Sequence, residues 1–565
     1  MTEVEAALGR VQTQLGSGDY DLFRRLVNTH AAVAAILNSH RAMLARLRRL
    51  FGLSSSERSC DVLAGQDTAA TDASAPSEDA SAGAEAEPTS SEPAGAAPTE
   101  RTKPKGHGRL AVSVYEAAEH IVVPHQNLQV GGACPDCRFG KLYDLKVPAQ
   151  FLRIFGQPML AGTCWDCQRL RCSSCLKIHT AKPPAEAQGP KFEESAVAMI
   201  ALCRYSLGLP HNRIEGMQKH MKLPIPASTQ CDVIYENAPA FEPVFAELER
   251  QGAQGELIHN DDTYGRVLAF MGERRAKLLQ QGDLPDPERV GGFTTAILSI
   301  TDEQPSLLFY TGRKYAGENL ATLLEAREDE LEPPMLMCDG LESRNLPKGH
   351  PVLASNCLTH GRRGFVEQLV NFPKECRHVI EELRKVYRAD GQCKKARASP
   401  LERLAIHQRD SAPIMNELEK RMQAELDEKR VEPNSGLGKA YKYMLKRWDK
   451  LTLFLRKAGA PLDNNVCERA LKMAIRHRRN SLFYRSERGA EIGDMFMSLI
   501  YTAELRGDNP FEYLTAVLRN EKAVAANPAD WLPWTYRDTL ARLAPQRGSA
   551  PASAQPTRVQ AIGAP

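Results

Sequence analysis

GELIHND (255–261), YGRVLAFM (264–271), GFTTAILSIT (292–301) and SLLFYTG (306–312) are four strand-like runs that follow one another in this chain of 565 residues. They are rich in β-branched and aromatic residues, and turn-forming residues separate them. This pattern predicts a meander of antiparallel strands.

Helical and strand-like patterns alternate after this meander. We expect a helix over ENLATLLEAREDEL (318–331), a buried strand over PPMLMCD (333–339), a strand over PVLASNCL (351–358) and a helix from about Gly361. Strands followed by alternating helices and strands predict a mixed sheet of the α/β class. Residues 375–456 are charged and helix-like, which predicts a helical insertion outside the sheet, and PLDNNVCERALKMAIRHRRN (461–480) predicts a strong helix.

Two aspartates stand where predicted strands end. Asp261 ends the first run, and Asp339 ends PPMLMCD. Open α/β sheets bind their ligands outside the carboxyl ends of the strands, so both positions suit an active site. An aspartate at a turn or a helix cap has the same pattern, so neither position is specific by itself.

A third acid, Glu468, occupies a special place on the predicted helix. At about 100° per residue, one arc of this helix is apolar and another carries four cations, and Glu468 falls at the seam between them. The cations are Arg469, Lys472, Arg476 and Arg479. An intrahelical pair of Glu468 with Lys472 is the alternative, but such a pair contributes only about 0.2–0.5 kcal/mol.

Three carboxylates on two strands and one helix suit phosphoryl transfer that uses two divalent metal ions. Mg²⁺ prefers carboxylate and water oxygens, and we expect two Mg²⁺ ions at Asp261, Asp339 and Glu468, with Mn²⁺ as a possible substitute. The cations near Glu468 would contact the phosphate backbone of DNA.

The ends of the chain differ in composition from its body. Residues 1–53 carry apolar residues at three- and four-residue spacings, which predicts a helical or coiled-coil region. Residues 54–108 predict a disordered acidic linker rich in Ala, Ser and Pro. Residues 54–100 have a charge of −9. Since the whole chain has a net charge of +3, the other residues together carry +12. A basic body fits a polyanion-binding protein, although the linker can also serve solubility alone.

The composition indicates a soluble, cytoplasmic protein. No run reaches the roughly 18 apolar residues of a membrane helix, and the first residues, MTEVEAALGRVQTQ, lack the features of a secretory signal. Cytoplasmic thiols stay reduced, so clustered CxxC pairs point to a metal rather than to disulfides.

Six of the 14 cysteines fall between residues 134 and 175. Cys134 and Cys137 in CPDC predict half of a structural zinc site, which needs four ligands. Spacing favours Cys164 and Cys167 as the second half, and a second pair, Cys172 and Cys175, follows. Cys357 and His360 also have ligand spacing, but no second pair lies near them in the sequence, so we predict no metal there.

Several stretches together resemble the transposases of insertion-sequence family sixty-six. The resemblance covers nearly all of residues 109 to about 540, and LARLRRLFG near the N-terminus is also similar. The stretches are HNDDTYGRVL, FYTGRKYAGENL, PPMLMCDGLESRNLP, SNCLTHGRRGFVE, RVEPNSGLGKAYKYML, PLDNNVCERALK and SLFYRSERGAEIGDMFMSLI. This family implies an RNase H-like catalytic domain of the DDE type, which cuts transposon ends and joins the freed 3′ hydroxyls to target DNA.

The resemblance assigns roles to individual residues. Asp261 matches the first acid of the family, with Asp262 beside it, and only one of these neighbours can face the site because adjacent strand residues point opposite ways. Asp339 matches the second acid and Glu468 the third. His360 and Arg363 look like the family's His-Arg motif and imply contacts with DNA, although a buried structural His fits the pattern equally. RLRCSSC is similar to the family at the second cysteine pair, so the implied zinc ligands are Cys134, Cys137, Cys172 and Cys175.

The predicted organisation has seven parts. These are a helical or coiled-coil region (1–53), a disordered linker (54–108), a zinc ribbon (109–185), a helical segment like those that bind DNA (186–250), an RNase H-like catalytic domain (251–490) with a helical insertion (about 375–456), a C-terminal domain (491–545) and a disordered tail (546–565).

The expected function is binding of insertion-sequence ends followed by metal-dependent cleavage and strand transfer. The alternative is a catalytically inactive, zinc-containing DNA-binding protein derived from a transposase. The resemblance implies DNA as partner, a homo-oligomer in the transposition complex and small accessory proteins of the same element, with no membrane. It also implies a bacterial cytoplasmic protein that is associated with the nucleoid when bound to DNA.

Overall fold

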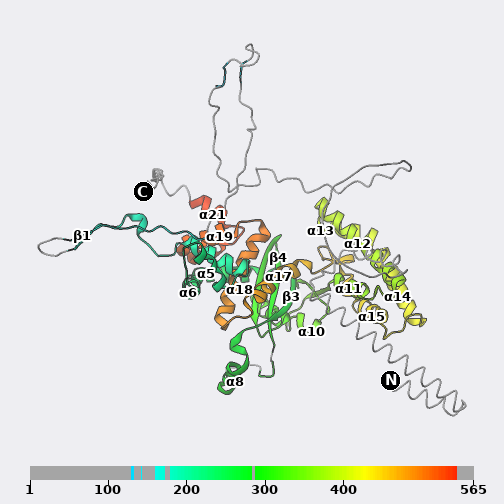
Figure 1. Cartoon of the computed structure of the whole chain (residues 1–565). Coiled ribbons are helices and arrows are strands. Elements are labelled where there is room, and N and C mark those ends of the chain that lie inside the picture. The colour runs from blue at the N-terminus through cyan, green and yellow to red at the C-terminus, as the bar shows by residue number, and fades with distance from the viewer. Residues whose placement is uncertain are drawn as a thin grey trace, which may run out of the picture.

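The computed structural model describes residues 129–132, 141–142, 159–171, 178–282, 287–289 and 291–543 (Figure 1). The predicted N-terminal helices, acidic linker and C-terminal tail lie outside these residues. The four predicted zinc ligands, Cys134, Cys137, Cys172 and Cys175, lie outside them as well.

A mixed sheet of five strands forms the centre of the described chain, in the order β5-β4-β3-β6-β7. Strands β3 to β5 are antiparallel neighbours, and β6 and β7 run parallel to β3. The expected mixed α/β sheet is therefore confirmed, and the antiparallel meander has three of its four predicted strands. The strands are β3 (Leu257–Gly265), β4 (Gly292–Thr301), β5 (Gln304–Gly312), β6 (Met335–Cys338) and β7 (Leu353–Asn356).

The strand predicted over residues 264–271 is wrong. Strand β3 ends at Gly265, which pairs with Gly292, the first residue of β4. Beyond that pair the chain has no partner strand in register. It makes one isolated bridge, from Val267 to Tyr484, and then the short helix η5 (Leu268–Phe270).

Two predicted helices differ slightly in their bounds. Helix α9 (Ala316–Leu324) ends well before residue 331. Helix α11 (Leu358–Gln368) begins three residues before Gly361, with Cys357 at its N-cap.

Helix α18 (Glu487–Arg506) covers the edge strand β5 (Figure 1). Side chains four residues apart on this helix accept hydrogen bonds from alternate backbone N–H groups of the strand. The Oγ1 of Thr502 accepts from Leu307 at 3.1 Å, and the Oγ of Ser498 accepts from Phe309 at 2.9 Å. Asp494 accepts from the backbone N–H of Thr311. A strand edge that would otherwise pair with another chain is thus satisfied by a helix.

Helices before and after the sheet share its hydrophobic core. The cluster runs from Leu160 to Tyr536 and includes strand residues such as Ile297 and Phe309. The predicted boundaries at 250/251 and 490/491 fall inside α7 and α18. The helices of this body are α4 (Glu194–Ala201), η3 (Leu202–Ser206), α5 (His211–His220), α6 (Ala227–Asn237), α7 (Glu242–Ala253), α17 (Asn465–Ser481), α19 (Pro510–Arg519), α20 (Glu521–Ala526) and α21 (Tyr536–Leu543).

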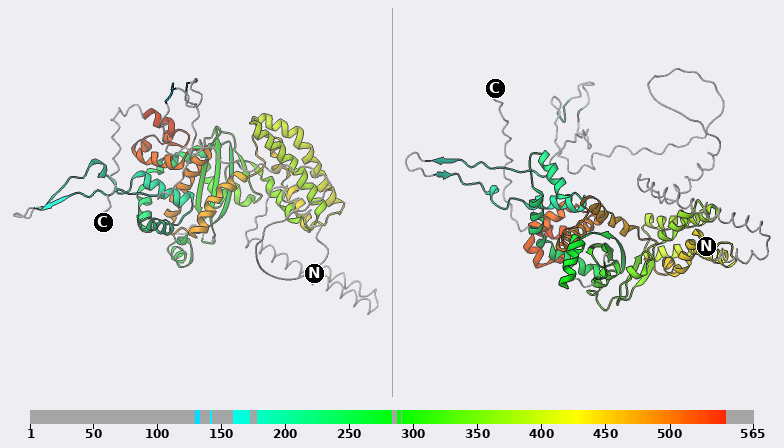
Figure 2. Two further views of the ribbon diagram at one scale, coloured as in Figure 1. Left: turned by 45° about the horizontal axis from the view of Figure 1, so that its top comes forward. Right: turned by 60° about the horizontal axis from the view of Figure 1, so that its bottom comes forward.

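The predicted helical insertion forms a bundle beside the sheet, with a second hydrophobic core (Figure 2). Helix α11 packs on α12 and α15 and so connects the bundle to the end of β7. The bundle contains α12 (Pro373–Ala396), α13 (Pro400–Ile406), η6 (His407–Ser411), α14 (Ala412–Asp427), α15 (Gly436–Lys446), α16 (Trp448–Leu451) and η7 (Leu453–Leu455).

The remaining elements are short. Strands β1 (Arg169–Arg171) and β2 (Ile178–Thr180) pair with each other in antiparallel fashion, away from the main sheet (Figure 1). Helices α8 (Gly272–Gln281) and α10 (Glu342–Asn345) and the single turns η2 (Ala185–Ala187), η4 (Ala238–Ala240) and η8 (Pro528–Trp531) complete the described elements. Among the described helices, none has the length and apolar character that a membrane span requires.

Asp494 predicts a pH dependence of stability. Burial raises its pKa to about 7, although hydrogen bonds from Thr311 oppose this. Because this pKa lies above that of the unfolded chain, the group's stabilising contribution is complete below about pH 4 and is lost as the pH rises through 7. In the wild type, this group should lower the free energy of unfolding by up to about 4 kcal/mol between pH 4 and pH 8. We expect Asp494→Asn to remove this decrease. Urea unfolding from pH 4 to 8 measures this.

Asp538→Asn, a change at an exposed aspartate of α21, is the matched control. Parallel stability profiles for the wild type and Asp494→Asn would contradict the assignment of this pH dependence to Asp494.

Candidate active site

The carboxyl ends of β6 and β7 lie level with the middle of β3. Asp261 therefore lies inside β3, which continues to Gly265, and the prediction that it ends a strand is wrong. His259 of β3 pairs with Met337 of β6, so Asp261 and Asp339 each lie two residues beyond that pair. Cys338 of β6 pairs with Asn356 of β7, so Cys357 follows at the same level as Asp339. Parallel strands advance in step, and residues at matched positions lie side by side. The edge at which α/β sheets place ligands therefore carries Asp261, Asp339 and Cys357.

Helix α17 brings Glu468 to this edge through its N-cap residue, Asn464. The side-chain Nδ2 of Asn464 donates to the carbonyl of Asn260 at 3.0 Å, and its Oδ1 lies 3.0 Å from Nδ1 of His259. All three residues are buried. Since Oδ1 only accepts, Nδ1 of His259 carries a proton. Glu468 lies in the first turn of the helix that this contact anchors.

A second set of hydrogen bonds fixes Asp339. Its Oδ1 accepts from the side chain of Asn345 and from the backbone N–H of Leu341, the latter at 2.9 Å. Its own carbonyl accepts from Nδ2 of Asn356 at 3.2 Å. The carbonyl of Gly340 accepts from Arg447 of the helical bundle at 3.0 Å. The turn after β6 is therefore fixed from the sheet, from α10 and from the bundle.

The other acids act on the charge of Asp261. Burial raises the pKa of Asp261 to about 7, and the charges of Asp339 and then Glu468 add to the effect. Such a carboxyl group either keeps its proton or ionises beside a bound cation.

Asp262 lies in a different environment from its neighbour. Burial and the charge of Asp339 raise the pKa of Asp262, but the backbone N–H of Ala316 in α9 and the charge of Arg344 in α10 lower it. The pKa of Asp261 is raised by the charge of Glu468 as well as by that of Asp339. This difference favours Asp261 as the acid nearer Glu468.

One cluster of metal-ligand types was missed by the sequence analysis. The ligand atoms of Cys357, His360 and Glu468 all lie within 4.8 Å of one another. Nδ1 of His360 lies 3.7 Å from Oε1 of Glu468. Spacing in the sequence gave only the Cys357 and His360 pair, because the third group comes from α17, far along the chain. The anchoring of α17 by Asn464 is what completes the cluster.

The predicted DNA-contacting cations lie on two helices. Arg469, Lys472, Arg476 and Arg479 are all exposed on α17. Arg476 also donates to the carbonyl of Ser206 at 2.9 Å. Arg363 is half-buried on α11, one turn after His360. The four exposed cations thus form one basic row along α17, which begins at Arg469, the residue after Glu468.

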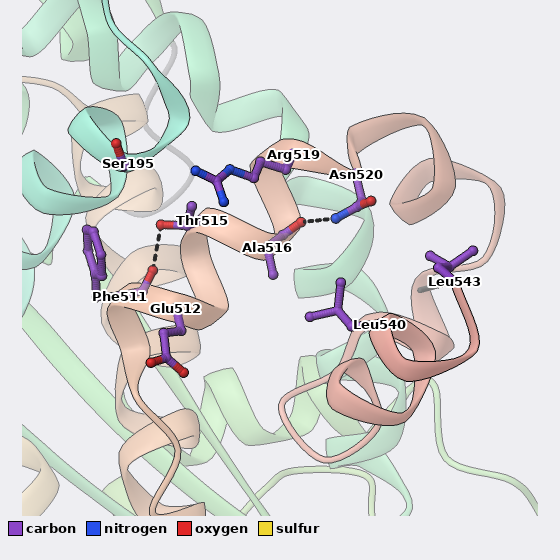
Figure 3. Close-up of a pocket in the computed structure, with 9 residues that line it drawn as sticks. All are labelled: Ser195, Phe511, Glu512, Thr515, Ala516, Arg519, Asn520, Leu540 and Leu543. Carbon is purple, nitrogen blue, oxygen red and sulfur yellow. Dashed lines mark hydrogen bonds between the residues drawn. The ribbon is translucent and has the colours of Figure 1, made fainter. Parts of the chain in front are cut away.

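Two other features contain none of the predicted catalytic residues. Cys164 is exposed and Cys167 is half-buried, and neither forms a disulfide. A cavity of about 660 Å³ lies between α4, α19 and α21, where Phe511 and Leu540 form part of its wall (Figure 3). Its lining contains no predicted site residue.

Comparison with known proteins identifies the family. The model of the Transposase IS66 family matches residues 190–492, more than half of the chain. The chain belongs to this family. The match covers Asp261, Asp339 and Glu468 as well as the helical bundle, so the sheet edge described above is part of an IS66-family transposase sequence.

Curated relatives of this IS66-family chain come from Sinorhizobium fredii (strain NBRC 101917 / NGR234). Uncharacterized protein y4hP is 24% identical over 391 residues, which are 66% of this chain and 67% of the relative. Uncharacterized protein y4jD is 32% identical over 202 residues, which are 34% of this chain and 38% of the relative. Uncharacterized protein y4qI is 23% identical, and the match spans 62% of its length. The chain thus spans less than two thirds of two of these relatives.

Asn464 gives a prediction about this IS66-family fold. Asn464→Ala leaves the side chain of His259 and the carbonyl of Asn260 buried without these partners, so we expect a loss of about 2–4 kcal/mol in the free energy of unfolding. Asn465→Ala, at the half-buried next residue, is the control and should change this quantity by less than about 0.5 kcal/mol. Chemical unfolding of both variants is the measurement, and equal stability of the two would argue against the anchoring role of Asn464.

Proposed function

We propose that this chain is a DNA transposase that binds the ends of an insertion sequence and catalyses metal-dependent cleavage and strand transfer. The observation that carries the proposal is the convergence of Asp261, Asp339 and Glu468 at one sheet edge in a member of a transposase family. The charges of both other acids raise the pKa of Asp261, which supports a site in which the three carboxylates act together.

The donor set fits hard divalent ions. The three carboxylates supply oxygen ligands, and Oε1 of Glu468 is buried without a hydrogen-bond partner among the described residues. Oxygen ligands of this kind suit Mg²⁺, with Mn²⁺ as a substitute. When bound, two such ions would stabilise the attacking and leaving oxygens of an in-line phosphoryl transfer. Asp261, Asp339 and Glu468 are the residues that we propose as their ligands.

The protein's own contribution is positioning. The contacts of Asp339 with Asn345 and Leu341 fix one carboxylate, and the contact of Asn464 with β3 fixes the helix that carries another. Rigid placement of this kind lowers the barrier because the ligands need not reorganise during the reaction. In cleavage, water attacks the scissile phosphorus and the 3′ oxygen leaves. In strand transfer, the freed 3′ hydroxyl attacks a phosphorus of the target DNA and loses its proton, and the 3′ oxygen of the target strand leaves.

We propose an RNase H-like arrangement for the catalytic domain. Three antiparallel strands followed by two parallel ones support this, as do acids on β3, after β6 and on a covering helix. The predicted zinc ribbon and N-terminal helices remain proposals for binding transposon ends. Cys172 and Cys175 stand in the sequence between β1 and β2, which pair with each other, as the knuckle of a ribbon would.

DNA is the partner that we propose for the basic row on α17. His360 and Arg363 on α11 are proposed to contact the same DNA nearer the acids. A homo-oligomer that brings two transposon ends together, and small accessory proteins of the same element, also remain proposals.

The first prediction of this proposal concerns the acids. Asp261→Asn, Asp339→Asn and Glu468→Gln should each reduce cleavage and strand transfer by at least about a thousandfold, because several kcal/mol of transition-state stabilisation depend on the metal ions. Binding to DNA should remain. The assay uses labelled DNA that carries the element's own ends, with Mg²⁺ and any accessory proteins of the element.

Asp262→Asn is the matched control, because its carboxyl interacts with α9 and α10 rather than with Glu468. Activity that persists in all three acid variants would overturn the assignment of the site. Binding without chemistry in the wild type would favour the inactive DNA-binding alternative.

The second prediction concerns the basic row. Lys472→Ala should weaken binding to DNA of any sequence and should lower the slope of log affinity against log salt by about 0.9, because one phosphate contact is lost. Fluorescence anisotropy with labelled DNA at about 50–200 mM salt measures both the affinity and its salt dependence. Lys522→Ala, a change at an exposed lysine of α20, should alter neither. A similar loss of affinity in both variants would exclude a specific role for α17.

A further inference from the structure

The cluster of Cys357, His360 and Glu468 has a donor set unlike that of the three acids. It combines a thiol, an imidazole and a carboxylate, drawn from the end of β7, from α11 and from α17. Thiolate and imidazole ligands favour Zn²⁺ and similar borderline-soft ions over Mg²⁺. The cluster is therefore suited to a different metal from the one proposed for the acids.

The distance between His360 and Glu468 distinguishes two arrangements. Nδ1 and Oε1 are 3.7 Å apart, which is too long for a hydrogen bond. Two ligands of one tetrahedral zinc ion, each about 2.0–2.1 Å from the metal, are separated by about 3.4 Å. Both atoms are buried, and neither has a hydrogen-bond partner among the described residues. Buried polar atoms that face each other in this way are destabilising until a cation lies between them.

The third ligand is prepared by the backbone. The N–H groups of Asn464 and His360 donate to Sγ of Cys357, the first at 3.3 Å. Cys357 is the N-cap of α11, and Asn464 is the N-cap of α17. The positive ends of two helices thus face the cluster and favour an anionic thiolate and carboxylate. Hydrogen bonds to a ligating sulfur are a common way to orient it.

Access and charge are consistent with reversible metal binding. The side chains of His360 and Glu468 are 23% and 26% exposed, so an ion can enter from their side, and Cys357 lies beneath them. A thiol that binds a metal ion does so as the thiolate, so ligation by Cys357 would release its proton to solvent. Three protein ligands leave a fourth position for water.

We propose that Cys357, His360 and Glu468 form a second metal site, selective for Zn²⁺-like ions, whose occupation withdraws Glu468 from the catalytic acids and inhibits the enzyme. Oε1 of Glu468 faces His360, so an ion in this cluster would take one of the two carboxylate oxygens, and part of the negative charge, from the catalytic acids. The binding of the ion depends only on the cluster. The inhibition rests on the proposed transposase function.

The first test uses Co²⁺ as a coloured substitute for Zn²⁺ on the full chain. Wild type should bind one equivalent more than Cys357→Ser, and the difference spectrum should contain a sulfur-to-cobalt charge-transfer band. His360→Ala should lose the same equivalent, and it serves if Cys357→Ser does not fold. Cys376→Ala, a change at a buried cysteine of the bundle, is the matched control and should bind as the wild type does. Any cobalt bound by other cysteines is common to all four proteins and cancels.

Equal cobalt content and identical spectra in wild type, Cys357→Ser and His360→Ala would overturn the site. A plain ion pair between His360 and Glu468 predicts that outcome, because it involves no sulfur.

The second test measures DNA cleavage in excess Mg²⁺ while Zn²⁺ is added. The concentration of Zn²⁺ that halves the activity should rise at least about tenfold in Cys357→Ser relative to wild type and Cys376→Ala, because a ligand is lost. Equal inhibition in all three would overturn the regulatory part of the proposal. If no form cleaves DNA but the cobalt difference persists, the metal site stands and the proposed function fails.

Discussion

The side-chain amide of Asn464 joins the start of α17 to β3, and the composition of the candidate active site depends on this contact. It contacts the carbonyl of Asn260 and the side chain of His259 in a fully buried setting. A buried polar group without a hydrogen-bond partner is destabilising, so the loss of Asn464 would leave polar atoms of the other two residues unsatisfied. Glu468 is remote in sequence from both aspartates. The register of the sheet places the aspartates, and this amide, together with the packing of α17 on β3 and β4, places the glutamate.

Crowded carboxylates are unfavourable for folding and useful for function. The raised pKa of Asp261 reflects burial and two neighbouring acids, and Oε1 of Glu468 lies buried without a partner among the described residues. Sites that violate the usual rules of polar satisfaction are where function is expected. The side-chain N–H groups of Asn260, Asn345 and Asn356 donate to backbone carbonyls or to Asp339. The side-chain oxygens of Asn260 and Asn356 are buried without a partner among the described residues, so unsatisfied acceptors extend beyond the carboxylates. The unpaired Oε1 leaves Glu468 open to either of the two metal sites that we propose.

The sequence predicted much of this arrangement because strand ends and helix faces are local patterns. Asp261 and Asp339 followed apolar runs, and Glu468 lay at the seam of an amphipathic helix. The failed strand over residues 264–271 shows the limit, because pairing requires a partner in register and composition does not reveal one. The cluster of Cys357, His360 and Glu468 was missed for a related reason. Its third ligand is adjacent only after α17 has docked on β3.

The contact between α18 and β5 imposes a constraint of length. Four residues of helix advance about 6.0 Å and two residues of strand about 6.8 Å, so every fourth helix residue can contact every second strand residue. The three pairs are Asp494 with Thr311, Ser498 with Phe309 and Thr502 with Leu307. Insertion of one residue between Asp494 and Thr502 would turn the later rungs about 100° away from the strand. Other side chains that accept hydrogen bonds can replace these three on the helix. A change in the length of the helix between them would instead leave backbone N–H groups of β5 unpaired and open to pairing with another chain.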